Sequence, residues 1–257
     1  MNGSAGAAVR LGWLGVVVLA AALPYDVLAD VDPAAMDLGA TSAHLLGTDH
    51  LGRDVVRRLA AGGRAFLVPG VGAAALATAG GVLVGAGIGW WGGAPAVALR
   101  AGLSAIAAIP GLALVLLLLL VTGPGPGGLA LAAGLVAFPA TATALADRVQ
   151  ALRGAEFVVA ARGHGLSDAR VLWWHLVWIN GRGLLAREAL ATLGQVLVLD
   201  VTLSYLGSFG VAEPASSWGN MIAHAVGSGS PNVWTWAAPV AATLLTLWAT
   251  VYDPEAR

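Results

Sequence analysis

The chain contains neither cysteine nor lysine, and each absence excludes a class of chemistry. Without Cys there is no disulfide, thiolate zinc site, iron–sulfur cluster or Cys nucleophile. Without Lys there is no Schiff base and no lysine of a phosphate-binding P-loop. Charge is also scarce: charged residues make up 11% of the 257 residues, whereas soluble domains carry about 25%. This composition excludes an ordinary soluble enzyme, and a net charge of −1 argues against a nucleic-acid partner.

Apolar residues take the place of the missing charge and amount to 58% of the chain. They gather into six runs of roughly the length that crosses a bilayer, at residues 11–29, 66–90, 103–121, 129–145, 184–206 and 233–252. Each run is predicted to be a transmembrane helix, since lipid offers the backbone no hydrogen-bond partner. The first run is interpreted as an uncleaved anchor rather than a signal peptide, because its apolar core is long. The sequence therefore predicts an all-α polytopic membrane protein.

The distribution of arginine predicts the orientation of these spans. With the N-terminus in the cytoplasm, nine of the 13 basic residues fall on the cytoplasmic side and four fall outside. Both termini are therefore predicted to be cytoplasmic. The four outer arginines share the long loop 30–65 and are Arg53, Arg57, Arg58 and Arg64. Apolar residues at helical spacing within residues 55–60 predict a short amphipathic helix lying on the outer membrane surface.

Glycine and proline positions predict how the spans pack and bend. Gly81, Gly85 and Gly89 recur at every fourth position of the second span, which is the spacing of close helix contact. Pro110 and Pro139 lie inside the third and fourth spans and are expected to kink them.

Asp200 is the main ionisable residue within a predicted span. A charge there is unfavourable in lipid and usually faces a cavity or a partner. Two interpretations stay open: Asp200 and Ser204 line or gate a translocation path, or Asp200 fixes contacts between helices. A hydrolase triad of these two residues with His224 is not favoured, because no nucleophile elbow surrounds the serine. No metal site is expected, since the five histidines form no zinc pattern, although His44 and His50 share a loop.

Residues 156–178 are polar enough to leave the membrane and patterned enough to be structured. They predict two short helices separated by a break at residues 163–165. Ser167 is expected to cap the second helix, with Asp168 in its first turn. Two functions stay open for this segment: it docks closely on another protein through a face of small residues, or it is an amphipathic connector lying on the inner leaflet.

The same residues resemble the EAA loop of type-I ABC importer permeases, whose pattern is Glu-Ala-Ala, three residues, Gly, nine residues and a hydrophobic-x-Leu-Pro ending. Ala160, Ala161 and Gly165 match this pattern, whereas Val159 stands in place of its Glu and Trp178 in place of its Pro. Within the family, the segment is most similar to the peptide and nickel branch, the C-type permease of dipeptide and oligopeptide importers. That branch reads Glu-Tyr-Val-x-Ala-Ala-Arg-x-x-Gly-x-Ser-Asp.

Two further stretches carry the same resemblance. Residues 46–55, Leu-Gly-Thr-Asp-His-Leu-Gly-Arg-Asp-Val, are similar to the signature that precedes the second span in this branch. Residues 203–207, followed by Pro214 and residues 217–221, are similar to its loop after the fifth span, and the terminal Asp-Pro at 253–254 also fits. Together the three stretches cover most of the chain from about residue 46 to residue 254.

The resemblance implies a MetI-like permease fold with six transmembrane helices in the bacterial inner membrane. It divides the chain into an N-terminal anchor with an extracytoplasmic loop and surface helix (1–62), a type-1 permease domain (63–253) with a cytoplasmic coupling loop at about 148–183, and a tail (254–257). It implies half of a translocation pathway for dipeptides, oligopeptides or a related small solute. A coupling helix would dock on the ATPase through Glu156, Ala160, Ala161, Arg162, Gly165 and Asp168.

The partners implied by the resemblance are a second permease subunit, two ATPase subunits or domains, an extracytoplasmic solute-binding protein and the lipid bilayer. The chain is not expected to be an enzyme or to hold a cofactor, since ATP and Mg²⁺ belong to the partner ATPases. The alternative is a self-sufficient polytopic membrane enzyme or a secondary transporter. Secondary transporters commonly carry broken helices and intramembrane charges in both repeats. Such charges are scarce here and no internal repeat is visible.

Overall fold

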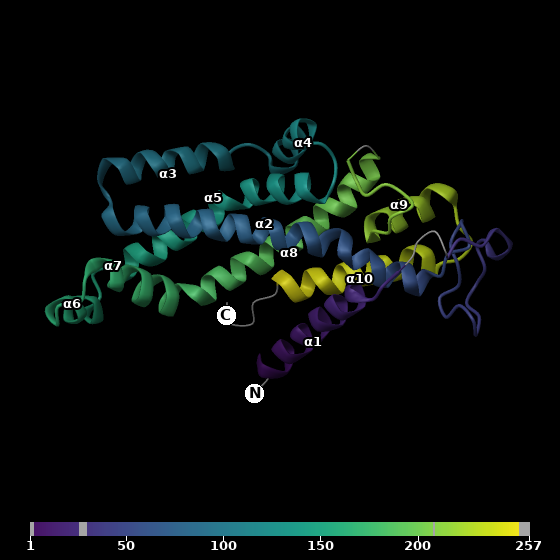
Figure 1. Cartoon of the computed structure of the whole chain (residues 1–257), viewed down its shortest axis with the longest axis horizontal. Helices are drawn as coiled ribbons and strands as arrows, with labels where there is room; N and C mark the ends of the chain where they lie inside the picture. The colour runs from purple at the N-terminus through teal and green to yellow at the C-terminus, as the bar shows by residue number, and fades with distance from the viewer. Residues whose placement is uncertain (1–2, 26–29, 208, 252–257) are drawn as a thin grey trace. The chain divides into compact units, whose positions relative to one another are not determined.

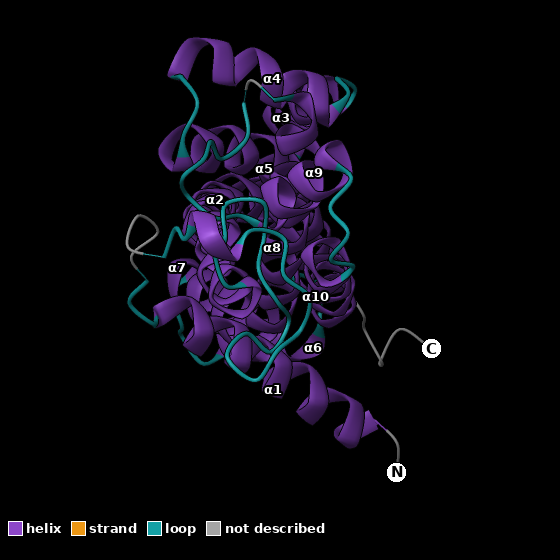
Figure 2. Ribbon diagram, turned by 90° about the vertical axis from the view of Figure 1, so that its right-hand side faces the viewer, coloured by secondary structure: helices purple, strands orange, loops and turns teal. Residues whose placement is uncertain are grey.

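The computed structural model describes residues 3–25, 30–207 and 209–251, and these residues form an assembly of helices (Figure 1). Among them there is no β-strand, and the one β-type pairing is an isolated bridge between Thr48 and Asp54. In Figure 2 the loops form the connections between helices. The all-α prediction is confirmed.

The described elements follow the chain in this order: α1 (Gly3–Ala22), a short 3-10 helix (Pro33–Ala35), α2 (Val55–Trp91), α3 (Gly93–Ala107), α4 (Gly111–Thr122), α5 (Pro126–Leu152), α6 (Glu156–Gly163), α7 (Asp168–Arg170), a π-helix (Val171–Ile179), α8 (Asn180–Leu206), α9 (Trp218–Ser228) and α10 (Trp234–Val251).

The chain divides into two compact units that are each discontinuous in sequence. The first unit comprises residues 1–70, 122–128 and 193–257, and the second comprises residues 71–121 and 129–192. Helices α2 and α8 each contribute one part to each unit.

In the first unit, α10 packs against both α1 and α9. The indole Nε1 of Trp13 on α1 donates a hydrogen bond of 2.9 Å to the hydroxyl of Thr246 on α10. Arg64 of α2 donates to the carbonyl oxygens of Ala21 and Leu23 at the C-terminal end of α1. The last carbonyls of a helix have no partner within the helix, so this guanidinium satisfies two groups that would otherwise be left unpaired.

In the second unit, α2 and α5 approach closely along a stripe of small residues. A Cβ atom added at Gly81 would lie 2.6 Å from the side chain of Thr141, and one added at Gly89 would lie 2.5 Å from the carbonyl oxygen of Ala146. A Cβ atom at Gly85 would collide with the backbone of residue 142. The absence of a side chain at the three glycines therefore allows the backbones of α2 and α5 to approach closely, and the predicted helix contact is confirmed.

Three helical stretches are long and apolar enough to cross a membrane: Val55–Trp91, Pro126–Leu152 and Asp168–Leu206. A fourth crossing exists if α3 and α4 form one span, although these helices are bent by 86°. The break falls at Pro110, which lacks a backbone N–H and ends the helix before it. Pro139, by contrast, lies inside a continuous α5. Six spans stay a prediction.

The expected surface helix is not a separate element. Residues 55–60 form the first turns of the 37-residue α2. Val55 is fully buried, and so are two of the four arginines around it, Arg53 and Arg58. These side chains find partners within the protein, so this end of α2 does not need to present a charged face to water.

Candidate functional sites

A network of buried charges joins the loop before α2 to the loop before α9. We name it the charge cluster, and its members are Asp49, Arg53, Arg58, Glu213 and Asn220. One carboxylate oxygen of Asp49 accepts hydrogen bonds from Arg53 Nε at 2.8 Å and from Arg58 Nη1 at 2.5 Å. Glu213 Oε1 accepts from Arg53 Nη2 at 2.6 Å. The Arg53 side chain is 0% exposed and that of Arg58 is 2% exposed, so both guanidinium groups are shielded from solvent, whereas the Glu213 side chain is 22% exposed.

The sequence around Asp49 folds locally to place these groups. The second oxygen of Asp49 accepts the backbone N–H of Leu51 at 2.8 Å and of Arg53 at 2.9 Å, and this closes a tight turn. Gly52 has a φ of +77° within the turn. A side chain at that position would also collide with the backbone of Asp32. The Asp-x-x-Gly-Arg spacing is therefore required by this turn.

The loop before α9 leads to Asn220, whose side-chain amide forms hydrogen bonds through both its oxygen and its nitrogen. Ser217 and Asn220 form a capping box at the start of α9. The side-chain oxygen of Asn220 accepts from Arg58 Nη2 at 3.1 Å. Its nitrogen donates to the carbonyls of Val211 at 3.1 Å and Ala215 at 2.7 Å. Asn220 thus fixes both the loop and the start of the helix against Arg58.

The cluster balances two acids against two guanidinium groups, and this sets its electrostatics. Burial alone would raise the pKa of Asp49, but the Arg58 guanidinium and hydrogen bonds from residue 53 outweigh it and hold that pKa below its ordinary value. Burial also opposes ionisation of Glu213, yet its hydrogen bond with Arg53 keeps its pKa below the ordinary value. Both acids are therefore ionised, and removing one partner would leave a buried charge uncompensated.

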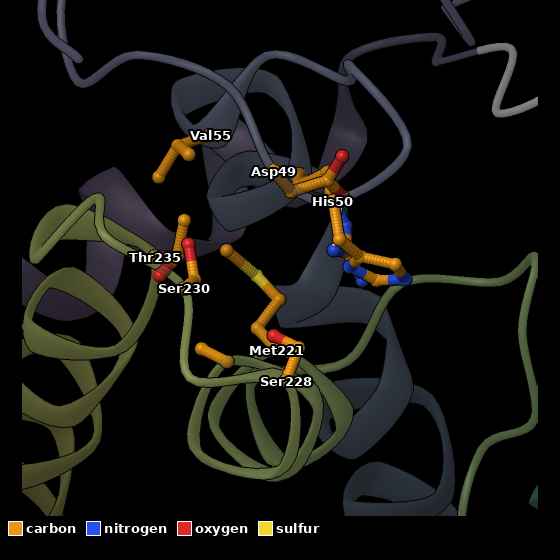
Figure 3. Close-up of a pocket in the computed structure, with 9 residues that line it drawn as sticks. Asp49, His50, Val55, Met221, Ser228, Ser230 and Thr235 are labelled. Atoms are coloured by element: carbon orange, nitrogen blue, oxygen red, sulfur yellow. Dashed lines mark hydrogen bonds and ion pairs between the residues drawn. The ribbon is translucent and has the colours of Figure 1, made fainter. Parts of the chain in front are cut away.

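Residues 46–55 and 203–221, the two stretches outside the EAA-like loop that resemble the permease family, meet in this cluster. The sequence did not indicate the contact, because Arg53 and Glu213 are 160 residues apart. The two histidines that share the loop before α2, His44 and His50, have different partners. His44 lies 2.8 Å from a carboxylate oxygen of Asp54, whereas His50 stacks on the ring of His224. Figure 3 shows His50 and Asp49 beside a pocket that is also lined by Met221 and Ser228 of α9.

Asp200 and Ser204 lie on α8 where it contacts the start of α9. Asp200 is 1% exposed, and neither of its carboxylate oxygens has a hydrogen-bond partner among the described residues. The backbone of Gly219 and the hydroxyl of Ser217 face that carboxylate, without meeting hydrogen-bond geometry. Ser204 donates to the backbone carbonyl of Asp200 at 2.8 Å. No triad forms, since His224 faces other groups.

In the second unit, residues 156–170 contain α6, which is the first predicted short helix, and the predicted break. The second predicted short helix is wrong, because α7 is the first turn of a helical stretch that runs from Asp168 to Leu206. We name residues 156–170 the α6–α7 segment. The N–H of Gly165 donates to the carbonyl of Arg162 at 2.9 Å, and that of Leu166 donates to the carbonyl of Ala161 at 3.1 Å. With a φ of +83° at Gly165, these bonds make a Schellman motif. Ser167 then caps α7 by accepting the N–H of Arg170 at 3.4 Å.

The α6–α7 segment has one face inside the protein and one outside. Val158 is 0% exposed and lies in an apolar cluster with Leu145 and Val149 of α5 and Leu176 of the π-helix. Ala161 is half-buried and packs against the same cluster. The other residues expected to dock on an ATPase are all exposed: Glu156, Ala160, Arg162, Gly165 and Asp168.

Arg162 fastens the turn between the two helices. Its guanidinium lies 2.9 Å from a carboxylate oxygen of Asp168. It also lies over the ring of Trp90 on α2, 4.7 Å from the ring centre. Such cation–π contacts at exposed sites contribute about 0.5–1 kcal/mol. The arginine therefore links α6, the start of α7 and α2, and its sequence pattern alone did not indicate the partner Trp90.

After the α6–α7 segment, the chain continues as helix where the resembling family has proline. Trp178 lies within the π-helix Val171–Ile179, and α8 follows at Asn180. The side chain of Asn180 donates to the carbonyl of His175 at 2.6 Å. A proline at position 178 would remove a backbone donor and interrupt the helix. Trp178 leaves the backbone free to continue into α8.

Most of the chain is similar to membrane components of peptide transport systems. A protein assigned as a peptide permease in Brucella suis biovar 1 is 34% identical over 231 residues, which is 88% of this chain and 75% of that protein. DdpC of Escherichia coli K12, assigned as the permease of a D,D-dipeptide transport system, is 31% identical over 225 residues (85% and 74%). OppC of the same organism, an oligopeptide transport system permease, is 30% identical over 234 residues (90% and 77%). No protein-family model matches the chain.

The similarity and the fold agree. The described helices include three to four apolar spans, as expected of a multi-pass membrane protein. The relatives are assigned as permease components of transport systems. The chain therefore belongs to the family of ABC importer permeases that includes the OppC and DdpC peptide transport components.

Proposed function

We propose that this chain forms one membrane half of an ABC importer that carries dipeptides, oligopeptides or a related small solute. The names of its relatives support the class of cargo. In this proposal six spans, with α1 and α10 as the first and last, pair with a second permease subunit, and a solute-binding protein delivers the cargo from outside. The division into an anchor (1–62), a permease domain (63–253) and a tail (254–257) belongs to the same proposal.

The α6–α7 segment is proposed to couple the chain to a separate ATPase. One observation carries this: α6 is a short helix with an exposed outer face and an inner face anchored in the apolar cluster. The Schellman motif and the Arg162–Asp168 pair hold it at its C-terminal end. A helix held in this way transmits a push as a rigid body. An amphipathic connector on a membrane would not need two such restraints.

ATP and Mg²⁺ are proposed to belong to the partner, as the chain has no lysine for a P-loop. Glu156, Ala160, Arg162 and Asp168 are proposed contacts of the docking surface, and Gly165 shapes it. Ala161 is reassigned to anchoring, because it packs against the chain's own apolar cluster.

The orientation is proposed with both termini and the α6–α7 segment in the cytoplasm. The four arginines on the outer side have a structural reason to be there. Arg53 pairs with Glu213, Arg58 pairs with the buried Asp49, and Arg57 lies 2.7 Å from a carboxylate oxygen of Asp30. Arg64 binds carbonyls of α1. Their presence follows from the fold of this loop and does not argue against the orientation.

Asp200 and Ser204 are proposed to belong to the translocation path or its gate. A carboxylate that is buried without a hydrogen bond is unfavourable, and such groups inside a membrane often serve function. The support is the position of Asp200 at the contact of α8 with the start of α9, where a shift of either helix would change its surroundings.

The test uses the chain co-expressed with its ATPase and permease partners. Gly165→Val forces a β-branched residue into left-handed backbone and should displace α7, whereas Gly165→Asn tolerates that backbone and serves as the matched control. We expect normal membrane levels for both, with ATPase co-purification and solute uptake reduced at least tenfold only for valine. Wild-type uptake with bound ATPase in Gly165→Val would refute the coupling role.

A further inference from the structure

Two histidines meet Glu213 of the charge cluster, and the possible metal-ligand atoms of the three side chains lie close together. His50 comes from the loop before α2, Glu213 from the loop before α9, and His224 from α9 itself. One ligand atom of each lies within 4.8 Å of the other two. The imidazole rings are stacked, with centres 5.3 Å apart and an angle of 25° between their planes.

The three groups converge without bonding to one another. His50 Nε2 is 3.5 Å from one carboxylate oxygen of Glu213, and His224 Nε2 is 3.9 Å from the other. Both separations exceed the usual 2.7–3.2 Å, roughly, of a nitrogen–oxygen hydrogen bond. The space that they surround suits an ion placed among all three groups, since nitrogen and oxygen ligands lie about 2.0–2.2 Å from zinc.

The charge cluster holds the Glu213 carboxylate in position through Arg53. Its Oε1 accepts the 2.6 Å hydrogen bond from Arg53, whose guanidinium is in turn fixed by Asp49. This leaves Oε2 directed toward His50. Outer partners of this kind orient a metal ligand and hold it ready for the ion. The positive charge of the two cluster arginines is balanced by Asp49 and Glu213, so the region has no excess of positive charge to repel a cation.

We propose that His50, Glu213 and His224 form a binding site for a divalent transition-metal ion, with Zn²⁺ as the best fit. Two imidazoles and one carboxylate suit zinc and its neighbours in the first transition row, whereas Mg²⁺ and Ca²⁺ prefer oxygen ligands alone. The side chains of His50, Glu213 and His224 are 26%, 22% and 46% exposed, so an ion can enter from solvent and water can complete its coordination. The bound ion ties the loop before α2 to α9.

The experiment uses the full chain, without a polyhistidine tag, in lipid nanodiscs after treatment with chelator. Zn²⁺ is titrated in competition with a chromophoric zinc indicator, and thermal unfolding is followed in parallel. We expect one Zn²⁺ per chain and a rise in melting temperature, with no comparable effect of Mg²⁺. His224→Ala and His50→Ala should each weaken binding at least tenfold.

The controls separate loss of a ligand from loss of the fold. His224→Ala should melt close to the wild type without zinc, because its approach to Glu213 is long, at 3.9 Å, and its side chain is 46% exposed. His44→Ala, in the same loop but paired with Asp54, and His164→Ala on the α6–α7 segment should keep wild-type affinity. Absence of stoichiometric Zn²⁺, or wild-type affinity for Zn²⁺ in His224→Ala or His50→Ala, would show that the proposal is wrong.

Discussion

The charge cluster and the α6–α7 segment hold loops in shape by opposite means. The cluster buries charged groups and joins residues about 160 positions apart. The α6–α7 segment is held by backbone hydrogen bonds between near neighbours and by an apolar inner face. The first arrangement fixes two distant loops to each other and leaves little surface free. The second presents its polar residues outward, as a surface that meets another protein must do.

The largest effect is expected where the cluster loses a cation. Arg58→Ala leaves Asp49 buried with one partner fewer and should lower stability by about 3–5 kcal/mol. Arg57→Ala is the matched control, because its side chain is 67% exposed and its pair with Asp30 is worth at most about 1 kcal/mol. Denaturant unfolding of the reconstituted chain measures both. Equal losses would mean that burial does not decide the strength of these pairs.

The next effect concerns the helix contact of the second unit. Gly85→Ala places a methyl group against the backbone of Ala142 and should destabilise the chain by about 1–3 kcal/mol through overpacking. Gly102→Ala, in α3 with nothing within 4 Å of the added group, should be neutral or slightly stabilising. Melting temperatures of the two variants compare them directly, and a neutral Gly85→Ala would contradict the close contact of α2 and α5.

Two neighbouring alanines of α6 separate anchoring from docking. Ala161→Asp puts a charge against the apolar cluster and should increase protease cleavage within residues 156–170, even without any partner. Ala160→Asp changes the exposed face only, so it should leave cleavage unchanged and weaken ATPase association. Limited proteolysis followed by co-purification distinguishes them. Identical cleavage in both would remove the distinction between the two faces.

A smaller effect is expected on acidification. Asp49 and Glu213 have pKa values below their ordinary ones, so their contribution to stability is complete above the unfolded values, about pH 4, and is lost as pH falls through the folded values. Melting temperature measured from pH 7 to pH 3 should fall at the acid end. The fall in melting temperature should be shallower in Arg58→Ala, because the ionised forms of Asp49 and Glu213 are stabilised less when this arginine is absent.

The sequence predicts local features of this protein better than distant contacts. The glycine spacing of α2, the break at Gly165 and the Ser167 cap all follow from the conformation or size of single residues, and the structure confirms them. Pro110 similarly marks the break between α3 and α4. Each of these features is decided within a turn or two of the chain.

What the sequence could not predict depends on pairing across the fold. Four arginines near residue 58 resemble the charged face of a surface helix, and only the approach of Glu213 and Asn220 shows that two of them are buried. The convergence of His50 with His224 has the same origin, since nothing in either stretch indicates the other. The sequence does not distinguish Ala161 from Ala160, because only the folded chain places the apolar cluster against Ala161.

The proposed docking of the outer face of α6 on an ATPase can be tested by site-specific crosslinking. A photoreactive residue replaces Ala160, and a second variant carries it at Leu45, a side chain that is 71% exposed in the loop before α2. In membranes that contain the assembled transporter, we expect a covalent product with the ATPase from position 160 and none from position 45. A product from position 45, or no product from position 160 in an assembly that transports normally, would contradict it.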